Sequence, residues 1–429
     1  MTEPRPWGRA AAWLLFLGPF FFLSYGFANW LASQRASVPV LAFEWERAIP
    51  FWAWTIVPYW SIDALYGLSL FLCATRGELD AHARRLLTAQ LVAIACFIAI
   101  PLRFSFERPS ADGLSGALFG LLAGFDLPYN QAPSLHIALA VILWVLYASK
   151  VRSAVARILL AVWFVMIGLS VLTTYQHHFV DLPTGFALGW LCVWLWPMPS
   201  PGAATALAWR PSSDPARRRM ALAYLAGAVA CAALALSIGG WALWLGWPAL
   251  SLGLVSIFYA GVGAAGFQKD ARGRLGLASR WLLAPYLAGA WLNSRWWTRR
   301  APAPVHVADG VWLGRMPARE DLDAFRGVVD VSAELSLPAA PVERHVVPML
   351  DLVAPDAASI ERAAHAIERL RPHGPVLVCC ALGYSRSACA IAAWLVATGR
   401  APGAEQAFAR VRSARAEIVL HEGHAKLFP

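Results

Sequence analysis

Long apolar runs separated by short polar segments dominate the first two thirds of the sequence. Each of the runs is close to the roughly 20 residues that an α-helix needs to cross a bilayer. Eight runs are found, near residues 11–31, 54–74, 87–103, 134–149, 154–173, 182–198, 220–239 and 246–266. The pattern predicts a polytopic α-helical membrane domain with about eight spans.

Basic residues between the runs predict the orientation. They concentrate before the first run and in every second loop after it, for example at Arg84, Arg85 and 217–219. Cytoplasmic loops of membrane proteins carry such an excess, so the N-terminus is predicted to be cytoplasmic. The net charge of +10 therefore does not indicate nucleic-acid binding. The Ala- and Arg-rich composition favours a bacterial protein, in the inner membrane.

The apolar segment 275–297 is harder to interpret. It contains Arg280, Pro285 and Asn293 and ends in tryptophans. A ninth span would place everything after it outside the cell. Polar interruptions and a Trp-rich end fit the headgroup region better, so we favour an interfacial or re-entrant helix.

The pattern changes at about residue 300. The sequence Arg299-Arg300-Ala-Pro-Ala-Pro is typical of a linker. Short apolar runs at 305–313, 328–332, 344–349 and 375–379 then alternate with helical patterns at 358–371, 386–398 and 403–416. This alternation predicts a small cytoplasmic α/β domain. We expect three parts: residues 1–200, two further spans with the interfacial helix at 201–299, and residues 300–429.

The segment that follows the last predicted strand carries a C-x5-R motif, from Cys380 to Arg386. Five intervening residues can close a loop whose backbone N–H groups point inward at a phosphate, with a helix N-terminus behind it. The same field favours a nucleophilic thiolate, and Arg386 can bind two phosphate oxygens. The alternative is a structural Cys at a strand end and a capping Arg. The predicted phosphate-binding loop consists of Ala381, Leu382, Gly383, Tyr384 and Ser385.

This region resembles the dual-specificity branch of the cysteine-dependent phosphatases. The resemblance implies that Cys380 forms a phosphocysteine, that Ser387 helps the thiolate to leave, and that an upstream Asp protonates the leaving oxygen. We favour Asp351 as this acid; the alternative, Asp356, is expected to cap a helix. Cys379 stands where the family usually has His. A disulfide between adjacent cysteines would be strained, and we do not expect one here.

Three polar clusters interrupt the membrane spans. They are Arg103-Phe-Ser-Phe-Glu-Arg108-Pro109, Pro133-Ser134-Leu135-His136 and Gln176-His177-His178-Phe-Val-Asp181. Ionisable groups at membrane depth are costly and usually functional, although headgroup anchors or buried structural histidines are alternatives. Arg103, Arg108 and Ser134 can bind a phosphate. Asp181 can orient His177 as a nucleophile, and His136 can protonate the leaving group.

Together the three clusters resemble the type 2 phosphatidic acid phosphatase family, over about residues 50–198. The resemblance implies a phosphohistidine intermediate and no metal. Arg103 lies five residues before Arg108, where the family spacing is seven. Thr173 and Thr174 occupy the region where the third motif usually has Arg. The choice of His177 over His178 rests on the H-x3-D spacing alone.

The whole architecture resembles bacterial fusions of these two phosphatase types. We expect a phosphatase without cofactor that acts on phospholipid or lipid-phosphate head groups in the bilayer. Dephosphorylation of Tyr, Ser or Thr in proteins, with a lipid-sensing membrane domain, is the main alternative. Head-group transfer by the membrane domain also stays open. A transporter or binding protein with inactive sites fits the residues least well.

Overall fold

A computed structural model of the chain describes residues 3–199 and 207–419. The chain divides into two compact units, residues 1–200 and 201–429. The first unit is helical, and the second combines helices with one five-stranded sheet. Each unit is described separately below.

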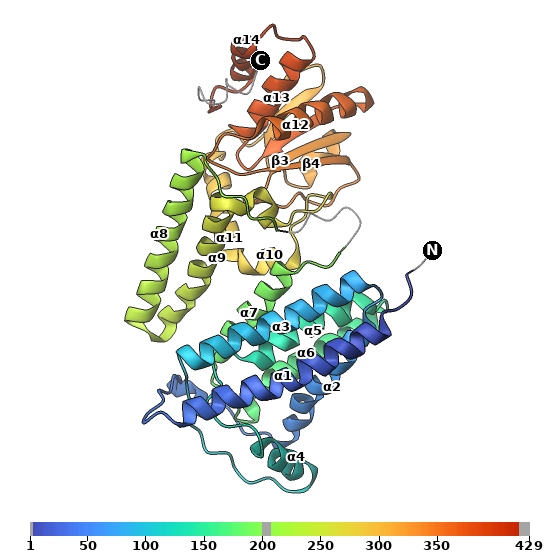
Figure 1. The fold of residues 1–429 in the computed structure, drawn as a ribbon. Coiled ribbons are helices and arrows are strands. Elements are labelled where there is room, and N and C mark those ends of the chain that lie inside the picture. Colours follow the sequence, from blue (N-terminus) through green and yellow to red (C-terminus); the bar gives the residue numbers. More distant parts are fainter. Residues whose placement is uncertain (1–2, 200–206, 420–429) are drawn as a thin grey trace. The chain divides into compact units, whose positions relative to one another are not determined.

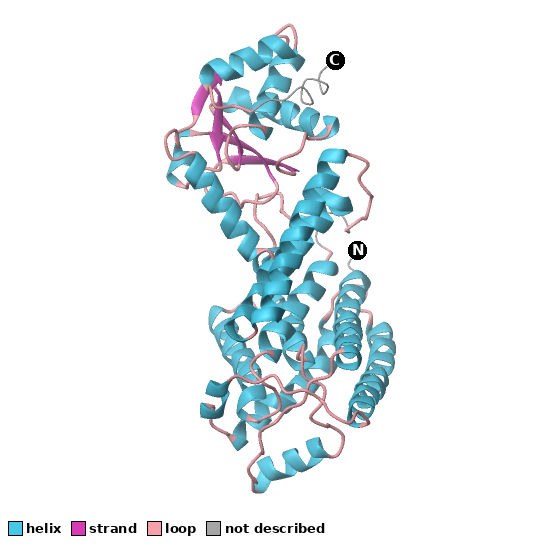
Figure 2. Cartoon of the chain, turned by 90° about the vertical axis from the view of Figure 1, so that its left-hand side faces the viewer, coloured by secondary structure: helices cyan, strands magenta, loops and turns pink. Residues whose placement is uncertain are grey.

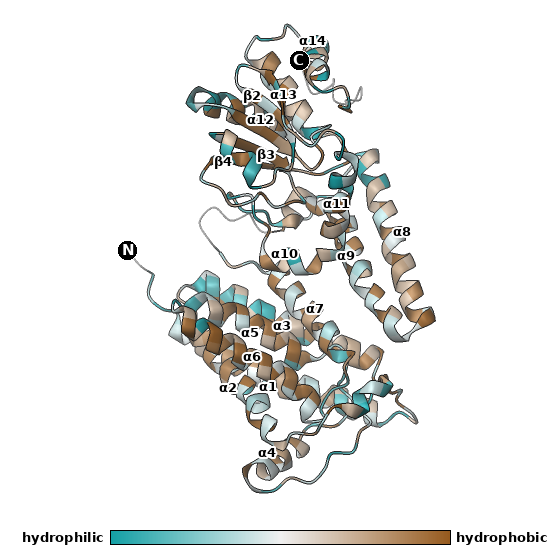
Figure 3. Ribbon diagram, turned by 180° about the vertical axis from the view of Figure 1, so that it is seen from behind, coloured by the Kyte–Doolittle hydropathy of each residue, from teal (hydrophilic) through white to brown (hydrophobic). Residues whose placement is uncertain are grey.

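The first unit is a bundle of apolar helices (Figure 1). Its helices are α1 (Trp7–Ser33), α2 (Ile56–Leu72), α3 (Arg76–Ala99), α4 (Gly113–Ala123), α5 (Leu135–Lys150), α6 (Ala154–Thr173) and α7 (Asp181–Leu195). Large apolar side chains face outward on several of them, such as Ile158 and Leu159 on α6, which are 63% and 65% exposed. Figure 3 colours the hydrophobic residues along these helices brown. Such outward apolar faces suit a lipid environment.

Each of the eight expected apolar runs falls on a helix. Among the described residues, six helical segments are long and apolar enough to cross a membrane: Trp7–Ser33, Ala53–Leu72, Arg76–Ala99, Ala154–Thr173, Pro215–Ile238 and Gly240–Phe267. The other two runs correspond to α5 and α7, which have 16 and 15 residues. The number of spans and their topology therefore stay predictions.

The helix α3 begins earlier than the run at 87–103 predicted. Thr75 caps its first turn by accepting a hydrogen bond from the Glu78 N–H at 3.2 Å, and the Glu78 carboxylate accepts one from the Ala74 N–H. Arg84 and Arg85 consequently lie on a helix and not in a loop. Arg85 is buried and donates to the Trp196 carbonyl at 2.8 Å.

Close packing of α5 against α7 positions the polar residues of this unit. A Cβ at Gly185 would lie 2.4 Å from the Ser134 carbonyl oxygen, and one at Gly189 would lie 2.8 Å from that of Ala138. Glycine is therefore required at both positions for the two backbones to approach. The approach brings Ser134, the N-cap of α5, against Asp181, the first residue of α7, and the Ser134 N–H donates to the Asp181 carbonyl at 3.1 Å.

The second unit starts with two long helices that pack side by side (Figure 1). They are α8 (Pro215–Ile238) and α9 (Gly246–Ile257), the latter continued by the helical turns η4 (Phe258–Val262) and η5 (Gly263–Phe267). The ambiguous segment 275–297 forms two helices, α10 (Leu277–Leu282) and α11 (Ala284–Trp297). Leu283 separates them, and Pro285 lies in the first turn of α11. This segment is not among the six candidate spans, and its interfacial position stays a prediction.

The sheet of the second unit has the order β1-β2-β5-β3-β4, with β1 antiparallel and the other strands parallel. Its strands are β1 (Val305–Ala308), β2 (Val311–Arg315), β3 (Gly327–Ser332), β4 (Glu343–Met349) and β5 (Val376–Cys380). The predicted single strand 305–313 is a hairpin, because Asp309 and Gly310 both adopt positive φ. Since parallel strands end at one edge, the residues after β3, β4 and β5 meet there.

Helices cover both faces of the sheet (Figure 2). One face forms a core with α12 (Ala357–Leu370), α13 (Arg386–Ala397) and α14 (Ala404–Ala414). The other face packs against loop residues such as Leu322 and Leu337, and against Ala290 of α11. The last of the apolar helices is thus part of the structure that covers the sheet.

Candidate active sites

The C-x5-R segment forms a closed loop between β5 and α13. Its tightest point is Gly383, whose φ is +76° and whose N–H points at the Cys380 Sγ at 3.2 Å. A Cβ at this position would lie 2.6 Å from the Gly314 carbonyl oxygen, so only glycine fits. The Ser387 hydroxyl also donates to the Cys380 Sγ, at 3.3 Å. Donors therefore surround the sulfur, as an anionic nucleophile or a bound phosphate requires.

Arg386 is 1% exposed and held from several directions. It donates to both carboxylate oxygens of Glu334, at 2.8 and 2.6 Å, and to the Met349 carbonyl at 2.9 Å. Although burial opposes its charge, Asp351 and Glu334 raise the pKa of Arg386. The pKa of Glu334 is lowered because Arg386 outweighs the effect of burial. Sequence reasoning missed Glu334, which fixes the guanidinium that was predicted to bind phosphate.

The two candidate acids have different surroundings. Asp351 follows β4, and its Oδ1 lies 3.0 Å from Arg386. Burial and the nearby Glu334 raise the pKa of Asp351 against the effect of Arg386, which suits a group that must donate a proton. Asp356 accepts hydrogen bonds from the Ser359 N–H at 2.8 Å and from its hydroxyl at 2.7 Å, as an N-cap of α12. The role of Asp351 as the acid stays a prediction that this geometry supports.

Cys379 points away from the predicted nucleophile, because successive residues of a strand face opposite sides of the sheet. It is buried with the Leu377 cluster, whereas Cys380 belongs to the cluster under α13. Both cysteines are free, and burial raises the pKa of the Cys379 thiol. Cys379 is thus a core residue in this structure.

Hydrogen bonds connect the Cys380 site to the apolar helices of the same unit. The Tyr259 hydroxyl, on η4, donates to the Asp351 carbonyl at 2.8 Å. From α11, the Ser294 hydroxyl donates to the Ala381 carbonyl. Lys269 donates to the Ser332 carbonyl at 2.6 Å and pairs with Asp330 on β3. These contacts, which the sequence did not reveal, reach each of the three loops that build the site.

The polar residues of the membrane unit form a second cluster. His177 Nδ1 lies 3.1 Å from Asp181 Oδ2, and its Nε2 lies 3.1 Å from the Ser134 hydroxyl. All three residues are buried. The carboxylate at Nδ1 favours the tautomer with its proton on that nitrogen, which leaves Nε2 as an acceptor. Such an arrangement can make Nε2 a nucleophile.

A cavity of about 480 Å³ adjoins this histidine. Arg103, Arg108 and His177 line it together with Asp126, which sequence reasoning did not single out. Arg108 is oriented by the Thr174 carbonyl, to which its Nε donates at 3.2 Å. A smaller cavity of about 110 Å³ contains His136 and also reaches His177 and Asp126. The structure thus places Arg103, Arg108, His136 and His177 around two adjacent cavities. Ser134 and Asp181 line neither cavity and contact His177 from behind.

His136 and Asp126 both lie beside His177 in the smaller cavity. The His136 ring stacks on Tyr59, with ring centres 4.2 Å apart, and its buried Nε2 has no partner among the described residues. Asp126 accepts a hydrogen bond from the Asn29 amide at 3.3 Å. His136 is therefore placed to act as the predicted proton donor beside His177, and burial raises the pKa of the Asp126 carboxyl.

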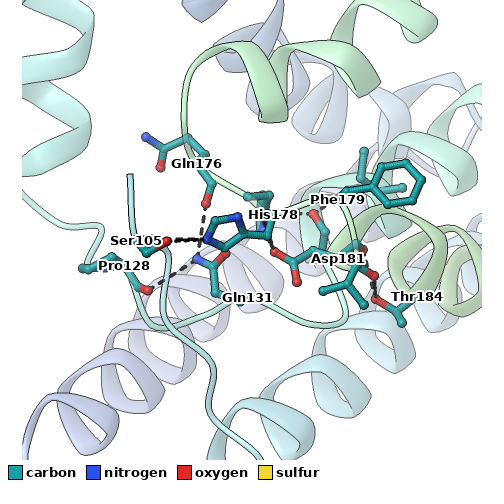
Figure 4. A network of polar contacts seen from close by, with 12 residues as sticks. Ser105, Pro128, Gln131, Gln176, His178, Phe179, Asp181 and Thr184 are labelled. Carbon is teal, nitrogen blue, oxygen red and sulfur yellow. Dashed lines mark hydrogen bonds and ion pairs between the residues drawn. The ribbon is translucent and has the colours of Figure 1, made fainter. Parts of the chain in front are cut away.

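The backbone N–H of the neighbouring His178 donates to Asp181 Oδ2 at 3.0 Å, but its side chain has other partners (Figure 4). Its Nδ1 lies 2.8 Å from the Glu46 carboxylate, and its Nε2 lies 3.1 Å from the Ser105 hydroxyl. Although burial opposes it, hydrogen bonding to His178 and to backbone N–H groups lowers the pKa of Glu46. This network ties the Arg103–Arg108 loop to the histidine pair, and it distinguishes the two histidines, which spacing alone could not do. Glu46 was missed because it lies far away in sequence.

Two family models match the sequence. Residues 20–200 match the PAP2 superfamily, and residues 316–427 match the dual specificity phosphatase catalytic domain. The chain joins a PAP2 superfamily domain to a dual specificity phosphatase domain. Both are phosphatase families, so the protein is an enzyme of phosphoester hydrolysis and, with its apolar helices, a membrane protein. The search of curated proteins gives no match.

Several solved phosphatase structures resemble about 30% of this chain. Tk-PTP in its active form is 27% identical, covers 30% of this chain and 94% of its own, and gives a TM-score of 0.27. Human DUSP28 is 29% identical, with coverages of 29% and 90% and a TM-score of 0.26. PTPMT1 in complex with PI(5)P is 20% identical, with the same coverages and TM-score. Among the described residues, no cluster of three or more His, Cys, Asp or Glu could hold a metal.

Proposed function

We propose that the protein removes phosphate from phospholipid head groups, using Cys380 in the dual specificity phosphatase domain. The observation that carries this proposal is the attachment of the Cys380 site to apolar helices. Tyr259, which contacts the Asp351 loop, belongs to the candidate span Gly240–Phe267. A site held by such a helix stays close to lipid head groups, where tethering raises its effective concentration.

The reaction at Cys380 follows from the loop geometry. The substrate phosphate occupies the loop, where backbone N–H groups and Arg386 neutralise its oxygens. The thiolate attacks phosphorus, and Asp351 gives its proton to the oxygen that leaves with the alcohol. Asp351 then accepts a proton from the water that hydrolyses the phosphocysteine, while the Ser387 hydroxyl, 3.3 Å from the sulfur, stabilises the departing thiolate.

For the PAP2 domain we propose a second reaction on a lipid phosphate. His177 Nε2 attacks phosphorus in the 480 Å³ cavity, Arg103 and Arg108 hold the phosphate oxygens, and His136 protonates the leaving group. Ser134, within 3.1 Å of Nε2, orients the ring together with Asp181. The phosphoryl group is then transferred from His177 to water, or to the hydroxyl of a second head group, while His136 takes back a proton from that acceptor.

The proposed location is a bacterial inner membrane, with the N-terminus and the dual specificity phosphatase domain in the cytoplasm. The argument is the distribution of Arg and Lys among the loops. The Cys380 site would then work on the inner leaflet and the His177 site at the outer face.

The test is phosphate release by membranes that contain the protein. The substrates are phosphatidyl-polyol phosphates, phosphatidic acid, a lipid pyrophosphate and a phosphotyrosine peptide, with wild type beside Cys380→Ser and His177→Ala. We expect release from the phosphatidyl-polyol phosphates to disappear with Cys380→Ser and to persist with His177→Ala. Loss of peptide turnover alone with Cys380→Ser would instead support a protein phosphatase.

A further inference from the structure

Arg315 stands beside the phosphate-binding loop and has no role in the mechanism above. It is the last residue of β2 and pairs in register with Cys380 at the end of β5. The loop also packs on the backbone of β2 at this residue, because a Cβ at Gly383 would lie 2.7 Å from the backbone nitrogen of Arg315. The Arg315 Nη1 donates to the Thr298 hydroxyl at 2.7 Å, which holds the guanidinium at this edge of the sheet.

Arg415, which comes much later in the sequence, also lies close to the phosphate-binding loop. It follows α14, is 3% exposed, and donates from Nη2 to the Ala303 carbonyl at 2.6 Å. The segment after it reaches the loop, since the Val419 N–H donates to the Tyr384 carbonyl at 2.8 Å. Burial and the nearby Arg315 lower the pKa of Arg415, while Tyr384, the Glu417 carboxylate and Cys380 act in the opposite direction.

The charges of these two arginines are not balanced as that of Arg386 is. Arg386 has two carboxylates within 3.0 Å, whereas neither Arg315 nor Arg415 forms an ion pair within the described residues. Among the described residues, the Arg315 Nε and Arg415 Nη1 atoms are buried and have no hydrogen-bond partner. Arg415 is buried and Arg315 is half-buried, and Arg415 senses the positive charge of Arg315, so an anion bound between the two would be favoured.

We propose that Arg315 and Arg415 form a second anion subsite, which binds the phosphodiester of a lipid whose terminal phosphate lies in the Cys380 loop. The ligand class is a phosphatidyl-polyol phosphate, which carries a phosphodiester and a phosphomonoester joined by a short polyol. Arginine suits this role because its planar fork matches two phosphate oxygens.

The strand order of the sheet places the general acid and the proposed second anion subsite on opposite sides of β5. Strand β2 lies on one side of β5, and β3 and β4 lie on the other. Glu334 and Asp351, which follow β3 and β4, provide the negative charges and the proton. The β2 side provides Arg315, which forms no ion pair among the described residues. The Tyr384 hydroxyl, which donates to the Trp297 carbonyl at 3.2 Å, connects this positive side to the end of α11, where the Trp296 and Trp297 side chains are exposed.

The proposal rests on the proposed lipid phosphatase function, and its test compares two substrates on the full-length protein in detergent micelles. One is a phosphatidyl-polyol phosphate and the other is p-nitrophenyl phosphate, which has no phosphodiester. With Arg315→Gln and with Arg415→Gln we expect KM for the lipid to rise about tenfold, as loss of one charge-assisted phosphate contact predicts. We expect kcat for p-nitrophenyl phosphate to stay within about twofold, because the loop and Arg386 are intact.

Controls distinguish the loss of a phosphodiester contact from a general effect of charge or of the acyl chains. Arg319→Gln removes an exposed positive charge nearby and should leave both substrates unaffected. The deacylated head group, with both phosphates and no acyl chains, should show the same loss with the two variants, whereas phosphatidic acid should not. An equal loss on p-nitrophenyl phosphate, or no change on the lipid, would overturn the subsite.

Two further measurements keep the test decisive. If a Gln variant does not fold, Arg315→Lys and Arg415→Lys retain the charge without the fork and should still raise KM for the lipid. In wild type, kcat/KM should be higher for the phosphatidyl-polyol phosphate than for phosphatidic acid, and the reverse order would also contradict the proposal. Absence of any Cys380-dependent lipid turnover would contradict the proposed function itself.

Discussion

The Cys380 site and the His177 site use the same elements in different settings. Each candidate nucleophile has a serine hydroxyl close by, Ser387 at 3.3 Å and Ser134 at 3.1 Å. Each site also has a buried carboxylate, which contacts Arg386 in one site and His177 in the other. They differ in how phosphate would be held. Six residues of one closed loop make the Cys380 cradle, whereas the His177 cavity draws its arginines from the irregular segment between α3 and α4.

This difference indicates which site is preorganised. The Cys380 loop is fixed by the backbone of Gly383 and by Glu334 under Arg386, so its donors already point at the phosphate position. The His177 cavity depends on the Glu46–His178–Ser105 network to keep its arginine segment in place. We therefore expect activity at the Cys380 site to change when a single side-chain atom of the loop is replaced. At the His177 site, we expect activity to change when the contacts that hold the Arg103–Arg108 segment are removed.

The largest expected effect comes from replacing either nucleophile, which should stop one reaction and leave the other unchanged. Cys380→Ser should lower turnover of the Cys380 substrate by at least about a thousandfold, because the nucleophile is lost. His177→Ala should do the same for the PAP2 substrate and leave the first reaction unchanged. Phosphate release from purified protein measures both. A loss of both reactions in either variant would show that the sites do not act separately.

Removal of the carboxylate under Arg386 should come next. Glu334→Gln breaks a buried ion pair and should lower the free energy of unfolding by about 3–5 kcal/mol. Because the pKa of Glu334 is lowered in the folded state, its contribution is present above its unfolded pKa and is lost as pH falls through the folded pKa. Thermal unfolding against pH measures this. The exposed Glu320→Gln is the control, and an equal shift there would contradict the argument.

Replacing the general acid should lower kcat by a smaller factor, and that factor should depend on the leaving group of the substrate. Asp351→Asn should lower kcat about a hundredfold for an alkyl phosphate, because a poor leaving group needs the proton. The raised pKa of Asp351 keeps it protonated to higher pH, so wild-type kcat should fall as pH rises through that pKa, and the variant should lose this fall. Asp356→Asn is the matched control. A pH profile unchanged in Asp351→Asn would exclude Asp351 as the acid.

The smallest effect tests the connection to the apolar helices. Tyr259→Phe removes one hydrogen bond to the Asp351 loop, worth about 1 kcal/mol, and should lower kcat about fivefold with KM for p-nitrophenyl phosphate unchanged. Tyr224→Phe changes a ring neighbour of Tyr259, with ring centres 5.4 Å apart, and leaves that bond in place. Equal kinetics for the two variants would mean that Tyr259 does not position the loop.

Sequence information was sufficient where the structure is local. The C-x5-R loop, the N-cap role of Asp356 and the apolar helices depend on neighbours in the chain. Glu334 and Glu46 were not found, because their partners Arg386 and His178 lie 52 and 132 residues away and the strand order is not readable from one sequence. The early start of α3 could have been predicted from Thr75-x-x-Glu78, which is a helix-capping pattern.

The Lys269–Asp330 pair has a consequence for protein engineering. Both side chains are 0% exposed, and the two residues lie on opposite sides of the linker at residue 300. A fragment that begins at this linker would keep the Asp330 carboxylate in the interior without its counter-charge, and would also lack Ser294 and Tyr259. The dual specificity phosphatase domain is therefore not expected to be stable as a fragment that begins at residue 300. A fragment for separate production should begin before Lys269, or Asp330 should be replaced by an uncharged residue.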